Sequence, residues 1–108
     1  MANFRIVRNY GAIPCSVTYS ILDASRTVLF SETVTNPPAA VPSPPNGTGI
    51  PVYAEIIVSG NKVIVDLNCC CPIELFCNCP PLNAYHLFKI CVEPDPAFIT
   101  TYLVTVYI

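Results

Sequence analysis

Charged side chains are what this sequence lacks most. Lys and Arg together number five, Asp and Glu together number seven, and charged residues make up 11% of the 108 residues, where about 25% is usual. A compact monomer of this mass exposes roughly 5,900 Å², for which so few charges are unusual. Because the hydrophobic fraction is 53% and the net charge only −2, little electrostatic repulsion opposes self-association. We therefore expect copies of the chain to cover much of one another's surface.

Signals for nucleic-acid binding, membrane insertion and secretion are also missing. The three Arg and two Lys are scattered and form no basic stripe, so nucleic acid is not an expected partner. The longest charge-free run, residues 33–54, contains six prolines, which a membrane-spanning helix does not tolerate. Residues 1–5 (Met-Ala-Asn-Phe-Arg) lack the apolar stretch of a secretory signal, so we expect no conventional signal peptide.

Catalytic patterns are absent as well. His86 is the only histidine, and it lies among Tyr85, Leu87 and Phe88, where a packed structural histidine is expected. The sequence contains no Gly-rich phosphate loop and no G-x-S-x-G motif, and its carboxylates show no pairing typical of acid–base catalysis. We therefore expect neither an enzyme nor a cofactor nor a small-molecule substrate.

Helical periodicity is nearly absent, whereas alternating β-branched and aromatic residues are frequent. Residues 52–59 and 62–68 alternate on both sides of Gly60-Asn61, which predicts a hairpin. Residues 15–22 and 27–35 favour a second hairpin, and residues 4–10, 84–93 and 97–108 favour further strands. These patterns predict an all-β chain that forms an antiparallel β-sandwich or a jelly-roll-like fold of about seven or eight strands.

The segment 36–51 is rich in proline. Its prolines favour an extended conformation without backbone ladder bonds, which is typical of a stiff crossover loop. A ligand for a proline-binding partner is the alternative. Asn46-Gly47-Thr48 within it matches a glycosylation sequon, although Asn-Gly is first of all a turn signal.

What the sequence does have is cysteine, seven in all: Cys15, Cys69, Cys70, Cys71, Cys77, Cys79 and Cys91. Five of them fall within eleven residues, which indicates disulfides or a thiolate metal site. If the chain reverses around Glu74, Cys69 faces Cys79 and Cys71 faces Cys77. Opposed Cα atoms in an antiparallel pair lie about 4.5–5.5 Å apart, which suits a disulfide. Because seven is odd, at least one cysteine is left for a bond between subunits.

Two other interpretations of the cysteines stay open. Reduced cysteines pack as small hydrophobic side chains. A metal site is the other possibility, although adjacent, C-x₅-C and C-x-C spacings match no common zinc or iron–sulfur pattern. A copper(I) thiolate cluster stays open as an alternative, because soft thiolates suit copper(I) and its coordination geometry is permissive.

The small size, low charge, all-β pattern and Cys-Cys run at Cys69 and Cys70 resemble the cysteine-rich spore-surface proteins of endospore-forming bacteria, especially the subunits of endospore appendages (spore pili). This resemblance implies a β-sandwich or jelly-roll subunit that polymerises by strand complementation from an N-terminal connector and is locked by disulfides. It also implies release by lysis of the mother cell, and hence a location outside the cell or on the spore or cell surface. The family's paired cysteines lie in the connector, whereas residues 1–13 contain none, so its cross-link map does not transfer.

Following the resemblance, we expect residues 1–13 to be an N-terminal extension or connector and residues 14–108 to form a single β-sandwich domain. The extension would add a strand to the sheet of the next subunit. Phe4 and Ile6 would lie on one face of this strand and Val7 on the other.

The sequence thus predicts a structural subunit whose partners are copies of itself. It would assemble into a disulfide-stabilised extracellular fibre, appendage or coat. The alternative from a different class is a small monomeric module that binds a metal through thiolates or binds another protein.

Overall fold

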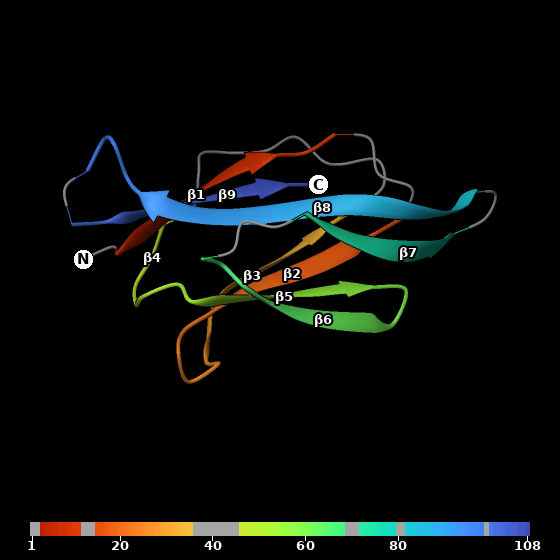
Figure 1. Cartoon of the computed structure of the whole chain (residues 1–108), viewed down its shortest axis with the longest axis horizontal. Coiled ribbons are helices and arrows are strands. Elements are labelled where there is room, and N and C mark those ends of the chain that lie inside the picture. Colours follow the sequence, from red (N-terminus) through yellow and green to blue (C-terminus); the bar gives the residue numbers. More distant parts are fainter. Residues whose placement is uncertain (1–2, 12–14, 36–45, 69–71, 80–81, 99) are drawn as a thin grey trace.

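The structure is a computed structural model that describes residues 3–11, 15–35, 46–68, 72–79, 82–98 and 100–108 (Figure 1). These residues contain strands and no helix, which confirms the predicted all-β fold. The strands in chain order are β1 (Phe4–Asn9), β2 (Val17–Leu22), β3 (Val28–Val34), β4 (Asn46–Gly47), β5 (Tyr53–Val58), β6 (Asn61–Asp66), β7 (Ile73–Cys79), β8 (Leu82–Pro94) and β9 (Tyr102–Tyr107).

The strands form two sheets that lie one over the other (Figure 1). The first sheet has the order β4-β1-β9-β8-β7, and the second has the order β3-β2-β5-β6. Neighbouring strands are antiparallel except for β1 and β9, which run parallel. The molecule is elongated, with extents of 45 × 28 × 20 Å. The sandwich prediction is therefore confirmed.

Turn chemistry explains the most regular hairpin, β5–β6. Ser59 and Gly60 connect the strands and have φ angles of 51° and 82°, as the two central residues of a type I′ turn require. Val58 pairs with Asn61, so the turn lies one residue earlier than the predicted Gly60-Asn61. The predicted pairing of the second and third strands is also confirmed, with an irregularity between Ile21 and Leu22.

The core lies between the sheets and follows the alternation of the strands. Alternate residues of β5 and β9 point inward, as do Phe88 and Ile90 of β8, because successive side chains of a strand face opposite sides. The largest fully buried side chains are Tyr19, Phe4, Phe88, Ile6, Ile21, Ile56 and Leu67. The accessible surface is 6080 Å², close to the value expected for a compact monomer of this mass.

The segment predicted as an N-terminal extension belongs to the domain over Phe4–Asn9. These residues form β1, which lies between β4 and β9 in the first sheet. Phe4 is 1% exposed and Ile6 is fully buried, whereas Val7 lies half-buried on the other face. In this single chain Phe4 and Ile6 fill the core of their own domain, and the predicted role of residues 1–13 as a connector between subunits stays a prediction.

The long strand β8 lies between β9 and β7 and pairs with each of them over a different part of its length. Its first half pairs with β7 from Leu82 to Phe88, and its second half pairs with β9 from Lys89 to Pro94. The predicted final strand 97–108 begins only at Tyr102, because the chain forms a loop after Pro94 in which Thr100 has a φ of 68°. Most of the predicted crossover loop, residues 36–45, lies outside the described residues.

Candidate assembly surfaces

The predicted cysteine hairpin around Glu74 was wrong. Ile73–Cys79 is one continuous strand, and the chain reverses after it, between Cys79 and Leu82, which are paired. Cys77 pairs with Ala84 rather than with another cysteine. The sequence carried a signal for this strand, because Ile73, Leu75 and Cys77 alternate with Glu74 and Phe76. The run 69–71 lies outside the described residues, so its pairing stays a prediction.

The other cysteines lie in different places. Cys77 is a free thiol that is fully buried in the core, and Cys15 is buried in the same core. Cys91 lies half-buried on β8, opposite Thr105 of β9. Within the described part of the chain, no group of three His, Cys, Asp or Glu residues could hold a metal ion.

Two groups of exposed apolar side chains lie on separate parts of the molecule. The first, which we call the end surface, consists of Ile50, Phe98 and Tyr102, which are 59%, 57% and 38% exposed. Asn3 connects the segment before β5 to the start of β9. Its backbone carbonyl accepts a hydrogen bond from the Tyr102 N–H at 2.9 Å, and its side-chain oxygen accepts one from the Gly49 N–H at 2.8 Å. The loops of this surface lie at the left in Figure 1.

The second group lies on the outer side of the first sheet, over β7, β8 and β9. We call it the β8 face; it consists of Phe76, Tyr85, Leu87 and Tyr107. Tyr85 is 66% exposed, Leu87 is 57% exposed and Tyr107 is 40% exposed. Phe76 pairs directly with Tyr85 across the hairpin, with ring centroids 5.3 Å apart. Because these residues are neighbours on one side of the sheet, they form a continuous apolar surface.

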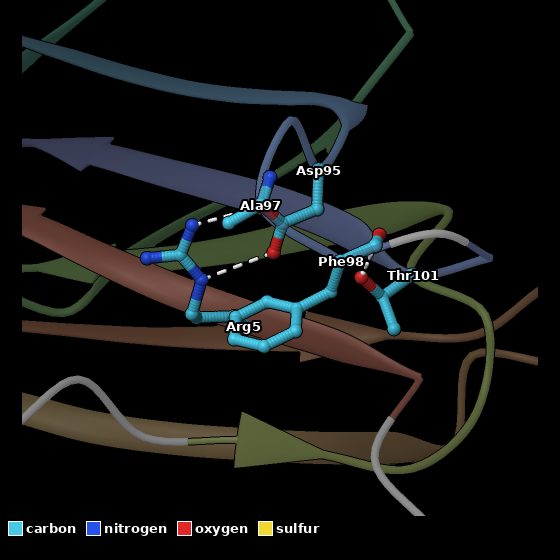
Figure 2. A network of polar contacts seen from close by, with 5 residues as sticks. All are labelled: Arg5, Asp95, Ala97, Phe98 and Thr101. Carbon is cyan, nitrogen blue, oxygen red and sulfur yellow. Dashed lines mark hydrogen bonds and ion pairs between the residues drawn. The ribbon is translucent and has the colours of Figure 1, made fainter.

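An ion pair fixes the end surface to β1. Arg5 donates two hydrogen bonds to Asp95, from Nε to Oδ2 at 3.0 Å and from Nη2 to Oδ1 at 2.9 Å (Figure 2). The Asp95 side chain is fully buried, and Oδ1 also accepts the Ala97 N–H at 2.9 Å. These hydrogen bonds lower the pKa of Asp95 to about 2, and the bond from Arg5 has the largest effect. The Phe98 ring covers the guanidinium at 5.7 Å from its centroid.

A second polar network joins the two sheets further along β1. The hydroxyls of Tyr10 and Tyr19 donate to Glu32 Oε2 at 3.0 and 2.8 Å, and the two phenol oxygens lie 2.9 Å apart. Arg8 donates from Nη1 to Glu32 Oε1 at 2.9 Å. Burial is the main cause that raises the pKa of both Tyr10 and Tyr19 well above the ordinary value. The two networks therefore anchor β1 at both ends.

His86 lies in the interior of the β7–β8 hairpin. It pairs with Leu75, and its ring packs edge-on against Phe88 with centroids 4.9 Å apart. Its Nε2 atom is buried and has no hydrogen-bond partner among the described residues. Burial lowers the pKa of His86 below its ordinary value. This is the packed environment expected from the sequence.

Sequence reasoning did not identify the exposed residues of either surface. Phe98 falls within the predicted final strand 97–108 but lies before β9, and Tyr85 and Leu87 enter the sequence prediction only as neighbours of His86. The alternation of Tyr85 and Leu87 with His86 and Phe88 places the two pairs on opposite faces. The alternation alone does not indicate which of the two faces packs against the second sheet.

No helix among the described residues is long and apolar enough to cross a membrane. Comparisons with protein-family models, with curated proteins and with solved structures find no match to this chain.

Proposed function

We propose that this chain is a structural subunit that self-assembles into an extracellular fibre, appendage or coat stabilised by disulfide bonds. The observation that carries this proposal is the presence of two separate apolar surfaces, the end surface and the β8 face, on one elongated molecule. Exposed apolar groups of this kind mark interaction sites. A subunit with two different contact surfaces binds two neighbours and so forms an open polymer, whereas a subunit with one surface stops at a closed pair.

Composition supports the same function. Charged residues make up only 11% of the chain and the net charge is −2, so copies approach one another with little repulsion. Cysteines of the run 69–71 would then supply covalent bonds between subunits. A covalent bond does not dissociate on dilution, which gives the assembly its persistence.

The resemblance to endospore appendage subunits supports a location on the spore or cell surface. In that family the N-terminal strand complements a neighbouring subunit. For β1 to act in this way, the strand of one copy would take the place of β1 in the next, with Phe4 and Ile6 entering the core of that neighbour. A chain lacking residues 1–13 would then fold only when a peptide of residues 1–13 is added.

Size and redox dependence test the proposed function. We expect the oxidised protein to elute far above its monomer mass of 11.7 kDa and to form fibres or sheets in negative-stain micrographs. Reductant should shorten or dissolve them. Replacing all seven cysteines by serine is too disruptive for a control because Cys15 and Cys77 are buried. The matched control is therefore the intact chain kept in reductant throughout, and equal monomer elution under both conditions would contradict the proposal.

A further inference from the structure

The β8 face carries one acid and one base beside its apolar centre. Glu74 lies directly opposite Leu87 on the neighbouring strand, and Lys89 lies two residues beyond Leu87 on the same strand. Both charged side chains are exposed. Among the described residues neither forms an ion pair, although Lys89 Nζ lies 5.6 Å from the centroid of the Tyr107 ring. The face is therefore neutral overall but presents both signs of charge.

Strand geometry fixes how these groups are arranged. Residues two apart on a strand lie about 7 Å apart, and neighbouring strands lie about 4.8 Å apart. Glu74 and Lys89 are thus separated by roughly 8 Å along a diagonal of the sheet, and Leu87 lies to one side of this diagonal, roughly 4 Å from its midpoint. Along this diagonal, Tyr85 and Phe76 lie on the Glu74 side. Tyr107, which pairs with Lys89, lies on the other side.

We infer that the β8 face binds the β8 face of a second copy about a two-fold axis that passes beside Leu87. This axis lies in the plane of the face and is perpendicular to the line from Glu74 to Lys89. Rotation about it places Glu74 of each copy opposite Lys89 of the other. The same rotation sets Leu87 against Leu87 and Tyr85 against Tyr107. One operation therefore satisfies both charges and covers the apolar residues.

Charge complementarity selects a second copy as the occupant. In a two-fold contact every favourable pair occurs twice, so the two exposed charges of one copy meet two opposite charges of the other. Buried aromatic and aliphatic groups at the centre would supply most of the affinity. The ion pairs at the rim would mainly determine orientation and specificity. A partner with charges of one sign would leave Glu74 or Lys89 facing a like charge.

This inference deepens the proposed function and rests on it, because it names the partner of one of the two assembly surfaces. A two-fold contact closes on itself, so this dimer is a building block. Growth beyond the dimer would use the end surface or disulfide bonds.

Charge reversal tests the two-fold contact. In sedimentation velocity under reductant, we expect the unmodified chain to dimerise and E74K and K89E each to dimerise at least tenfold more weakly, because each places two like-charge pairs in the contact. An equimolar mixture of E74K and K89E should dimerise again, since all four charged groups then face opposite charges. The double variant E74K/K89E should recover as well.

An apolar pair of variants provides the matched control. Leu87→Asp should abolish the dimer, whereas Ile64→Asp, at a partly exposed position on the other sheet, should leave it intact. Dimers that survive Leu87→Asp or both single charge reversals would overturn the inference. In that case the proposed function stands if oxidised fibres still form, and it falls as well if the unmodified chain stays monomeric under oxidising conditions.

Discussion

Arg5 and Asp95 are 90 positions apart in the chain, yet they form two parallel hydrogen bonds of 3.0 and 2.9 Å. Paired bonds between a guanidinium and a carboxylate are among the stronger polar contacts in proteins. Through this pair the start of β1 holds the loop that follows β8, and with it the exposed ring of Phe98. One ion pair therefore connects the stability of the fold to the shape of the end surface.

The first prediction concerns the Asp95 carboxylate at acid pH. Its pKa is lowered from the ordinary value to about 2, so its ionised form is favoured by folding. The resulting stability is fully present above about pH 4, the ordinary value, and is lost as the pH falls through about 2. We expect the melting temperature to decrease between pH 4 and pH 2, as measured by thermal unfolding followed by circular dichroism.

The control for this titration is Asp95→Asn, which keeps the shape of the side chain and removes the charge. We expect its melting temperature at pH 7 to fall by several degrees, because Arg5 loses its charged partner. The part of the acid dependence that comes from Asp95 should disappear in this variant. An unchanged acid profile would contradict the assigned role of the pair.

The second prediction concerns β1 as part of the core. Ile6 is fully buried, so Ile6→Ala should lower the free energy of unfolding by about 2–5 kcal/mol. Val7 lies half-buried on the opposite face of the same strand, and Val7→Ala should cost clearly less. Urea unfolding measures both. Equal and small losses would mean that β1 does not fill the core of its own chain.

The third prediction concerns alkaline unfolding. Burial and the bonds around Glu32 raise the pKa of Tyr10 and Tyr19 above the ordinary value. Stability from these groups is therefore fully present below pH 10, the ordinary value, and is lost as the pH rises above it. Phenolate absorbance should show these two tyrosines ionising together with unfolding.

Tyr19→Phe serves as the test variant for the tyrosine network. Removing its hydroxyl takes a hydrogen bond of 2.8 Å from Glu32 and should cost about 1 kcal/mol at pH 7. The variant should also lose less stability between pH 10 and pH 12 than the unmodified chain. Phenolate absorbance from all tyrosines before the loss of sheet structure would count against the buried network.

The fourth prediction concerns the thiol of Cys77. Because this side chain is fully buried, it should react with an alkylating reagent only when the chain opens. Mass spectrometry of reduced protein should find Cys77 protected in native buffer and labelled in denaturant. Cys77→Ser should cost about 1–3 kcal/mol because it buries a hydroxyl. Rapid native labelling would show that Cys77 is not in the core.

The parts of the fold that sequence predicted are those fixed by local chemistry. The β5–β6 hairpin follows from alternation and from a turn at Ser59-Gly60, whose positive φ angles suit few residue types. The buried faces of β2 and β9 follow from the same period-two pattern.

The parts that sequence did not predict depend on contacts between distant segments. The parallel pairing of β1 with β9 joins the two ends of the chain, and nothing near Phe4 or Ile6 indicates it. The cysteine register failed because the reversal was placed at Glu74, although Ile73 and Leu75 already alternate with it. Arg5 and Asp95 likewise carry no local signal of their pairing.

Self-association is the central claim of this account, and the mass of the particle in solution tests it most directly. Sedimentation velocity of the unmodified protein, over increasing concentration and with and without reductant, measures that mass. We expect species far above 11.7 kDa that grow with concentration and become smaller in reductant. A single species of 11.7 kDa at every concentration, unchanged by reductant, would contradict the account.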